Sequence, residues 1–328
     1  MKYFSLNLVA RLLPLLLNTH GKQRLSILIF HRVLPGHDPM RPDEPTISEF
    51  DWQMRVLRDS FSPLALVDAL ERLRTGTLPS RAVCVTFDDG YADNELYALP
   101  VLQKYGIPAT VFISTGFLNG GRMWNDSIIE TLRNCPGEKL DLSELGLGCF
   151  FLESFPQRLE VVESIIQRIK HLDPGDRAAL VTEIEARGIS LPNDLMMTDA
   201  QVQSLSRNGV SIGAHTVNHP ILASVSSEIA RGEIQQSKLY LEALLQQEIE
   251  LFAYPNGKPE LDYAKEHRNL VEELGFKAAV STHWGVSTNQ SDWFQLPRFT
   301  PWDRRELKFA LRLLANYRRV DPLIANGH

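Results

Sequence analysis

Cysteine is scarce in this sequence, and its three copies, Cys84, Cys135 and Cys149, show no Cys-x-x-Cys spacing. An odd number of widely spaced cysteines argues against a disulfide framework and against a zinc site built from thiolates. Cys84 lies inside an apolar run and is best interpreted as a small buried residue. Neither a disulfide-stapled fold nor a cysteine-ligated metal domain is therefore predicted.

An excess of positive charge is also missing. The 34 lysines and arginines are outnumbered by 40 aspartates and glutamates, which gives a formal net charge of -6. Proteins whose main partner is a nucleic acid usually carry a basic footprint, so a nucleic acid is not predicted as a partner. The length of 328 residues and the hydrophobic fraction of 44% indicate a globular chain with a sizeable core.

No uninterrupted apolar run near the N-terminus is long enough to span a membrane. The stretch 6–17 is broken by Arg11 and Pro14 and is shorter than the roughly 20 residues that a span needs. No small-x-small cleavage site follows it, so a signal peptide is not expected either. We expect residues 1–24 to form a helical segment that packs on the domain itself, with an amphipathic helix lying on a membrane as the alternative. The expected location is cytoplasmic, with peripheral association at the inner membrane as the alternative.

Short apolar runs alternate with helical patterns along the chain, and such continuous runs are typical of strands that are buried on both faces. The predicted strands are residues 25–30, 82–87, 109–114, 209–214, 249–254 and 276–282. Two of the helices between them begin with the capping boxes Thr46-x-x-Glu49 and Thr198-x-x-Gln201. This alternation predicts an α/β fold with a parallel sheet, open or closed into a barrel, whose functional groups lie at the carboxyl ends of the strands.

The segment from about 119 to 197 breaks this alternation. It is largely helical, mixed in charge and without a clear strand. We interpret it as an insertion between strands, on the same face as the functional site. Ordinary core helices of the main domain are the alternative.

Two adjacent carboxylates, Asp88 and Asp89, follow a predicted strand, and Gly90 permits a sharp turn after them. A second apolar strand leads into His215 and His219, which are four residues apart. In a helical turn such positions share a face, so both imidazoles can reach one metal ion. Two histidines and one aspartate make a three-ligand site of the open, catalytic type. The alternative for the two aspartates is that they cap the next helix.

The stretches TFDDG at 86–90 and His-Thr-x-x-His at 215–219 resemble the first and second motifs of the polysaccharide deacetylases, the NodB-homology members of carbohydrate esterase family 4. The resemblance covers residues 25–114 and 197–302. It implies a distorted (β/α) barrel over residues 25–328, with the helical segment inserted into it. It also implies a divalent metal, usually Zn²⁺, and the hydrolytic removal of acetyl groups from N-acetylated sugars.

By this resemblance, Asp89, His215 and His219 bind the metal and Asp88 is the general base. One carboxylate neutralises the ion and is fixed by it. The other stays free to take a proton from a water that the metal activates. Thr216 either orients the first histidine or contacts substrate, or it simply begins a helix.

The family's third motif, an Arg followed by Pro-Tyr-Gly, is altered here to Phe252-Ala-Tyr-Pro-Asn-Gly257. We expect the backbone N–H of Asn256 to face the oxyanion. The arginine that normally orients the catalytic aspartate is missing, and Arg298 is the candidate to replace it. A purely structural ion pair is the alternative for Arg298.

The family's last motif, a Leu-x-His that supplies the general acid, has no counterpart after Arg298. Leu28 and Ile29 precede His31 at the end of the first predicted strand. A barrel is cyclic, so a strand from the N-terminus can take the place of one that is normally supplied last. This order resembles the circularly permuted deacetylases of exported exopolysaccharides. His31 is therefore the predicted general acid, and His283, which also follows a strand, is the reserve.

Aromatic residues near motif ends or loop tips could together form a platform for a sugar, while ordinary packing is the expectation for each residue alone. They are Tyr91, Trp124, Tyr254 and Trp302. The basic stretch 304–319 is predicted to be the solvated face of a final helix, with contact to a membrane surface as the alternative.

Together these assignments predict a metal-dependent hydrolase that removes N-acetyl groups from a carbohydrate in exopolysaccharide or cell-envelope glycan metabolism. Its expected partners are an N-acetylated glycan and a divalent metal, with Zn²⁺ expected; no oligomeric state is predicted. One alternative is a non-catalytic carbohydrate-binding relative, which the altered third motif favours. Another is a metal hydrolase that acts on O-acetyl esters or on a non-sugar amide.

Overall fold

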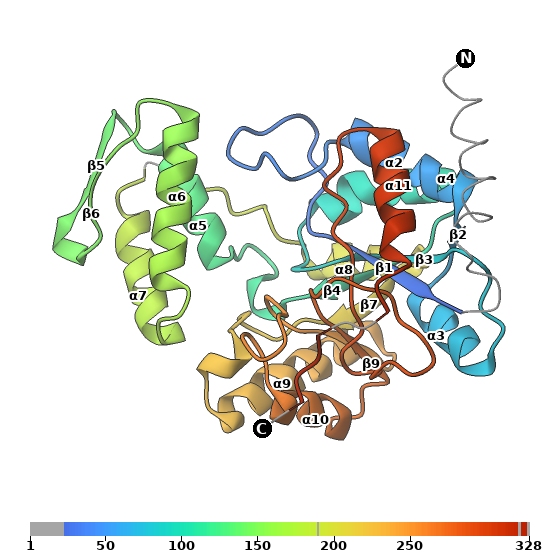
Figure 1. The fold of residues 1–328 in the computed structure, drawn as a ribbon. Helices are drawn as coiled ribbons and strands as arrows, with labels where there is room; N and C mark the ends of the chain where they lie inside the picture. The colour runs from blue at the N-terminus through green and yellow to red at the C-terminus, as the bar shows by residue number, and fades with distance from the viewer. Residues whose placement is uncertain (1–22, 189, 321–322, 327–328) are drawn as a thin grey trace, which may run out of the picture.

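Every predicted apolar run contains a strand of one curved parallel sheet (Figure 1). The computed structural model describes residues 23–188, 190–320 and 323–326, so most of the predicted N-terminal segment 1–24 lies outside the described residues. The strands of this sheet are β1 (Leu25–Phe30), β2 (Ser62–Pro63), β3 (Ala82–Phe87), β4 (Ala109–Ile113), β7 (Ser211–Ala214), β8 (Leu251–Ala253) and β9 (Ala278–Val280).

The order of the strands explains how the sheet curls into a barrel. It runs β1-β3-β4-β7-β8-β9, with β2 added beside β3. Residues 296–299 then contact both outer strands, because Leu296 bridges to Val280 of β9 and Phe299 bridges to Leu28 of β1. β1 therefore lies beside residues 296–299. This is the arrangement expected if a strand from the N-terminus takes the place of one that is normally supplied last. The predicted distorted (β/α) barrel is confirmed.

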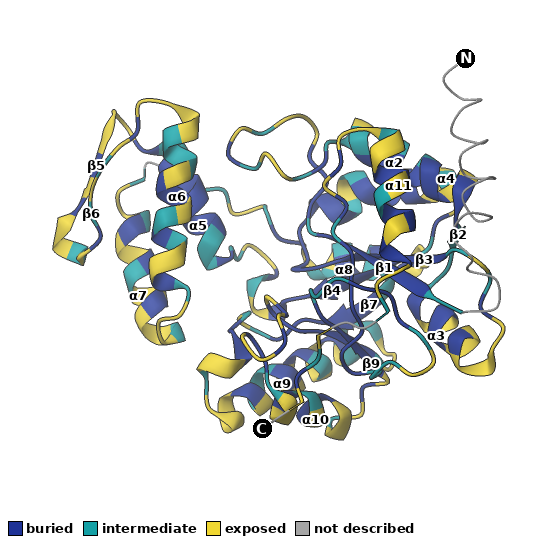
Figure 2. Cartoon of the chain, in the orientation of Figure 1, coloured by how far each residue is buried: buried dark blue, intermediate teal, exposed yellow. Residues whose placement is uncertain are grey.

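Helices surround the sheet and bury its outer surface. They are α2 (Ile47–Ser60), α3 (Leu66–Thr75), α4 (Leu99–Tyr105), α8 (Asp199–Arg207), α9 (Ser227–Leu245), α10 (Lys265–Glu273) and α11 (Glu306–Asn316). Both predicted capping boxes are present, at the start of α2 and of α8. The strands are buried and the outward faces of the helices are exposed (Figure 2). No helix in the described part of the chain is both long and apolar enough to cross a bilayer.

The interior of the barrel is filled by side chains rather than by water. Ile27, Cys84 and Phe112 belong to one buried cluster and are each at most 1% exposed. Cys84 is the small buried residue that the sequence predicted, and burial raises the pKa of its thiol. A packed interior leaves only the ends of the strands available for chemistry.

The predicted insertion stands beside the barrel and packs around an apolar cluster of its own (Figure 1). Its elements are α5 (Trp124–Asn134), β5 (Lys139–Leu142), β6 (Gly148–Phe151), α6 (Phe155–Ile169) and α7 (Pro174–Glu185). The expectation that it has no strand was wrong, because β5 and β6 form an antiparallel hairpin. Each of these strands has four residues, which is too short for a periodic pattern to stand out in the sequence.

Candidate active site

Both aspartates of the TFDDG motif face one cavity because the chain turns sharply after β3. The backbone N–H of Asp88 donates to the carbonyl of Phe30 and so extends the sheet by one bond (2.9 Å). Asp89 and Gly90 then adopt positive φ values of 77° and 92°. A Cβ at position 90 would lie 3.1 Å from Cγ2 of Ile113, so glycine also gives the turn room. Asp88 binds an arginine and Asp89 faces two imidazoles, so the helix-capping alternative does not apply.

The second motif forms an irregular turn at the end of β7. Thr216 and His219 both have positive φ values, 66° and 51°, so the expectation of a helical turn was wrong. The Glu233 carboxylate on α9 accepts the backbone N–H of Val217 and of Asn218, at 2.9 and 2.7 Å. The Thr216 hydroxyl accepts the backbone N–H of His219 at 3.1 Å and donates to the carbonyl of His215. Thr216 therefore shapes the turn that brings the two histidines together.

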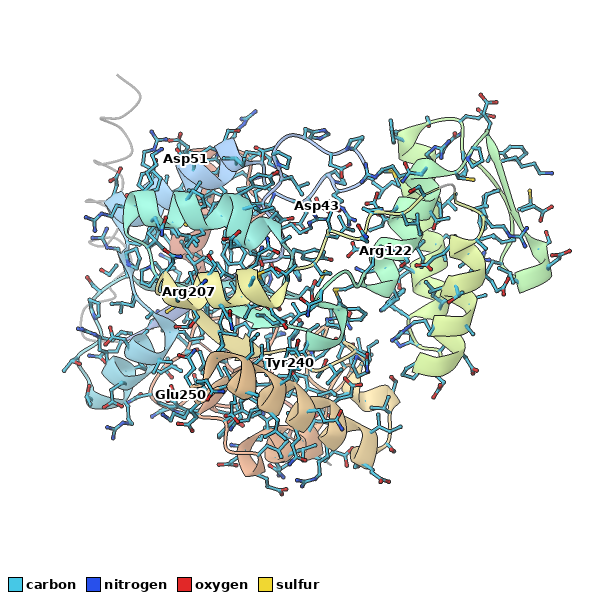
Figure 3. All side chains as sticks on the ribbon, turned by 180° about the vertical axis from the view of Figure 1, so that it is seen from behind. Asp43, Asp51, Arg122, Arg207, Tyr240 and Glu250 are labelled. Carbon is cyan, nitrogen blue, oxygen red and sulfur yellow. The ribbon has the colours of Figure 1, made fainter. Side chains whose placement is uncertain are left out.

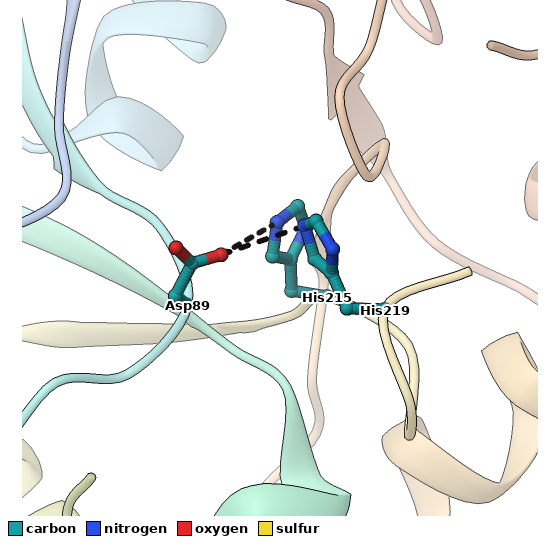
Figure 4. Close-up of side chains that lie close together, drawn as sticks. All are labelled: Asp89, His215 and His219. Carbon is teal, nitrogen blue, oxygen red and sulfur yellow. Dashed lines mark ion pairs between the residues drawn. The ribbon is translucent and has the colours of Figure 1, made fainter. Parts of the chain in front are cut away.

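Asp89, His215 and His219 converge on one point (Figure 4). Asp89 Oδ1 lies 3.4 Å from His215 Nε2 and 3.5 Å from His219 Nε2. His215 Nδ1 lies 2.7 Å from the carbonyl of Ala253, which makes Nδ1 the donor and leaves the Nε2 lone pair directed at the cluster. The buried Asp89 Oδ1 has no hydrogen-bond partner among the described residues. A buried carboxylate oxygen without a partner beside two nitrogen donors fits a divalent cation such as Zn²⁺.

The electrostatics of the cluster favour the protonation states that a cation needs. Burial alone would raise the pKa of Asp89, but the neighbouring imidazoles lower it well below its ordinary range. Burial lowers the pKa of His219 to about 4, against the attraction of Asp89. Burial also opposes the charged form of His215, yet Asp88 and Asp89 together raise its pKa. At neutral pH Asp89 is thus ionised and His219 is neutral.

Asp88 is held by Arg298 rather than by the histidine cluster. Arg298 Nη1 and Nη2 donate to the two oxygens of Asp88 at 2.7 and 2.6 Å. The guanidinium is fully buried, and its Nε donates to the carbonyl of Ser281 at 2.8 Å. Burial would raise the pKa of Asp88, but Arg298 and then His215 lower it. The carboxylate is consequently ionised and fixed in orientation.

Of the two candidate acids, the structure brings only His31 to the aspartates. His31 follows β1 and lines the cavity that holds Asp88, Asp89 and the two clustered histidines. His283 lines a different hollow, together with Trp284 and Arg319.

Asn256 lies at the rim of the same cavity, in the turn after β8. Asn256 and Gly257 have positive φ values of 57° and 71°. The Thr282 hydroxyl donates to the carbonyl of Asn256 at 2.6 Å, and its backbone N–H donates to the carbonyl of Gly257 at 2.9 Å. Among the described residues, no group accepts a hydrogen bond from the backbone N–H of Asn256.

The four candidate aromatic residues differ in exposure and in the cavity that they line. Tyr91 and Tyr254 are 3% and 0% exposed, so both are packing residues, although Tyr91 also lines the cavity. Trp302 is exposed but lines a hollow away from the aspartates. Trp124, the first residue of α5, lines the cavity itself.

The cavity has a volume of about 560 Å³. The insertion was expected on the face of the functional site, but most residues of the cavity's second wall were not identified from the sequence. That wall is made by residues 40–44 of the loop after β1 and by α5 and α6 of the insertion. From α6 it includes Leu159, Glu163 and Ile166, at helical spacings of four and three residues. This spacing is present in the sequence, but nothing there shows that this face of the helix meets the barrel.

Buried ion pairs connect the two parts of this wall. Arg41 of the loop contacts Asp126 at 2.8 Å and Glu130 at 2.9 Å, both on α5. At the junction with the barrel, Arg122 donates to Glu185 at 2.8 Å and to the carbonyl of Pro192 at 2.6 Å. Figure 3 labels Arg122 where the insertion begins and Asp43 on the loop. The insertion is therefore attached to the barrel at its junction and along its cavity side.

A parallel barrel that gathers an arginine-bound carboxylate, a second carboxylate and two imidazoles at the carboxyl ends of its strands has the site of a hydrolase. The family model for polysaccharide deacetylases matches residues 75–146 and 149–279, which is more than half of the chain. The chain belongs to the polysaccharide deacetylase family. The predicted family, and with it the predicted class of hydrolases acting on carbon–nitrogen bonds, are confirmed.

Relatives and solved structures agree with this assignment. YxkH of Bacillus subtilis, whose name refers to the same family, is 22% identical over 284 residues, which cover 86% of this chain and 73% of that protein. The poly-beta-1,6-N-acetyl-D-glucosamine N-deacetylase of Staphylococcus epidermidis is 27% identical over 216 residues, covering 61% of this chain and 71% of that protein.

Two solved structures share the fold. The deacetylase PplD of Streptococcus pyogenes, in complex with acetate, has a TM-score of 0.60 at 21% identity and covers 89% of this chain and 99% of its own. IcaB of Ammonifex degensii has a TM-score of 0.57 at 19% identity and covers 89% of this chain and 96% of its own.

Proposed function

We propose that this protein uses a divalent metal, Zn²⁺ by preference, to remove N-acetyl groups from an exopolysaccharide or cell-envelope glycan. One observation carries the proposal: Asp89 faces two imidazoles, while the neighbouring Asp88 is bound by Arg298 in the same cavity. Two adjacent carboxylates thus have different partners, which suits one ligand and one base. The Staphylococcus epidermidis relative is named as an N-deacetylase of such a glycan.

Asp89, His215 and His219 would hold the metal, which supplies a Lewis acid for the acetamide carbonyl and for water. Asp88 has the role of general base. Because Arg298 keeps its carboxylate ionised and oriented, Asp88 can accept a proton from the attacking water without first reorienting. A positioned base typically contributes about 10²–10⁴-fold in rate.

The remaining groups act on the acyl oxygen and on the leaving amine. The backbone N–H of Asn256 stabilises the negative charge that develops on the acyl oxygen. The water oxygen bonds to the acyl carbon, the carbon–nitrogen bond breaks, and His31 donates a proton to the departing nitrogen. The products are acetate and a sugar with a free amine.

Arg298 weakens the case for a non-catalytic carbohydrate binder. That alternative rested on the missing arginine of the third motif, and Arg298 presents a guanidinium to the same carboxylate from residues 296–299. A binder would have no use for an ionised carboxylate that is hydrogen-bonded to an arginine beside the proposed ligands. The cytoplasmic location and the peripheral membrane association stay predictions, which fractionation of cells tests.

The test is acetate release from N-acetylglucosamine oligomers, measured with chelator and after Zn²⁺ is added back. We expect release that is lost with chelator and restored by the metal. Oligomers that are O-acetylated instead of N-acetylated serve as the comparison substrate. Faster release from the O-acetyl esters would replace the proposed amide substrate, and release that is insensitive to chelator would contradict the metal.

A further inference from the structure

The cavity is larger than an acetamide and its attacking water require. The groups with proposed catalytic roles lie at its barrel end, whereas its far side consists of the insertion. A volume of about 560 Å³ falls within the roughly 300–1,000 Å³ that is typical of sites for whole organic ligands. The far side therefore has room to contact parts of the substrate beyond the acetyl group.

The side of α6 that faces the cavity has a mixed character. Leu159, Glu163, Ile166 and Lys170 lie along one side of this helix and line the cavity. Leu159 and Ile166 are half-buried, and Glu163 is exposed. Ile165 belongs to the apolar core of the insertion, and the partly buried Ile166 and Trp124 pack against the same core. Apolar and charged side chains therefore alternate along this side, with Ile166 between Glu163 and Lys170 and with Leu159 beyond Glu163. This alternation matches a sugar, which has apolar CH faces and polar edges.

Trp124 lines the same cavity, and one face of its ring is already covered. The guanidinium carbon of Arg177 on α7 lies 4.8 Å from the centroid of the indole ring. Arg177 is 4% exposed, and its Nη1 donates to the carbonyl of Lys170 at 3.1 Å. A guanidinium on one face stabilises the ring and restricts its rotation. A ligand that stacks on the cavity side therefore meets a ring that is already ordered.

The distance between Trp124 and the proposed catalytic groups is also held by packing. The ion pairs from Arg41 to Asp126 and Glu130 tie the first helix of the insertion to the loop that follows His31. The side chains of Arg41 and Asp126 are 8% and 0% exposed. This attachment keeps a sugar on Trp124 in a constant position relative to the barrel.

We propose that Trp124, with Leu159 and Ile166, forms a stacking subsite for a second sugar of the substrate, so that the protein prefers N-acetylated glycan chains to single sugars. The inference rests on the proposed function, which it extends from the acetyl group to the chain. The class of substrate is an oligomer or polymer of N-acetylated sugars. A free or lipid-linked monosaccharide would leave this subsite empty.

The test compares kcat/KM for acetate release from N-acetylglucosamine and from its tetramer. An aromatic contact of the usual strength corresponds to about threefold to tenfold in affinity. We expect Trp124→Ala to lower kcat/KM for the tetramer by about that factor and to leave the monosaccharide unaffected, while Trp124→Phe keeps most of the preference. Trp124→Leu removes the ring but retains apolar volume, and it serves if the alanine variant does not fold.

Trp302→Ala is the matched control, because Trp302 is 44% exposed and lies outside this cavity. This variant should change kcat/KM for neither the tetramer nor the monosaccharide. A second readout is calorimetric binding of the tetramer to metal-stripped protein, which Trp124→Ala should weaken by about the same factor. If the wild type releases acetate but the Trp124 variants match it in length preference and in tetramer affinity, the subsite is overturned and the deacetylase proposal stands. If the wild type releases no acetate from any oligomer, the proposed function fails, and tetramer binding alone decides the subsite.

Discussion

Arg298 and Asp88 are 210 residues apart in the sequence and are joined by two parallel hydrogen bonds of 2.7 and 2.6 Å. Neither side chain is more than 3% exposed. Such a pair fixes both the charge and the orientation of the carboxylate. It exists because residues 296–299 lie between the two outer strands of the sheet, so closing the barrel also completes the site.

The first prediction concerns the loss of this guanidinium. Arg298→Met leaves a buried carboxylate without its partner, and breaking a buried pair typically costs about 3–5 kcal/mol of unfolding free energy. Combining Arg298→Met with Asp88→Asn should recover part of that loss, because no unpaired charge remains. Urea unfolding of the two single variants and the double variant measures the coupling. Losses that simply add up would show that the two side chains do not stabilise one another.

The second prediction separates the proposed base from the proposed ligands. Asp88→Asn should lower kcat by about 10²–10⁴-fold and leave bound Zn²⁺ unchanged, since both oxygens of Asp88 are hydrogen-bonded to Arg298 and its nearest approach to the ligand cluster is 4.0 Å, to His215 Nε2. Asp89→Asn should lose the metal, because the orphan Oδ1 of Asp89 is the acidic member of the cluster. Zn²⁺ content after dialysis and acetate release are measured on the same samples. Near-wild-type activity in Asp88→Asn would remove it from the role of base.

Local patterns in the sequence predicted most of the fold. Strands buried on both faces appear as continuous apolar runs, and the capping boxes at Thr46 and Thr198 depend only on residues three positions away. The location of the two carboxylates in the site was also predictable, because Asp88 and Asp89 come directly after a strand. The β5–β6 hairpin is the exception, since four-residue strands carry too little periodicity to be seen.

What the sequence could not predict depends on contacts between distant segments. The spacing of His215 and His219 is typical of a helical turn, but Glu233 on α9 binds the backbone of the residues between them and holds an irregular turn instead. The insertion was expected on the face of the functional site, but the residues that form the second wall of the cavity were not identified, for the same reason. Arg41 of the loop after β1 pairs with Asp126 of α5, and nothing in the sequence around the insertion indicates this contact.

The third prediction tests the choice of general acid. His31→Ala should lower the rate of amide hydrolysis by about 10²–10⁴-fold, because an amine leaves only when it is protonated. Hydrolysis of p-nitrophenyl acetate should fall much less, since its leaving group departs without a proton. The control is His283→Ala, in which the residue lost lines a different hollow and no change is expected. Equal losses on the amide and the ester would show that His31 does not act on the leaving group.

The fourth prediction concerns the attachment of the insertion. Arg41→Met leaves the buried Asp126 without its arginine, while Glu130 keeps Arg133 at 2.9 Å, and we expect a loss of about 3–5 kcal/mol in the free energy of unfolding. Arg74→Met removes an arginine from an exposed pair with Glu71, whose side chains are 64% and 57% exposed, and it should leave stability almost unchanged. Urea unfolding followed by circular dichroism measures both variants.

The same Arg41→Met variant shows whether the attachment matters for the substrate. If the ion pairs hold the insertion at its working distance, the variant should also lose its preference for the tetramer over the monosaccharide, under conditions where it remains folded. This follows because Trp124 begins the helix that carries Asp126 and Glu130. A destabilised variant that keeps its full length preference would show that the wall is positioned by other contacts, namely the pair of Arg133 with Asp38 and the junction at Arg122.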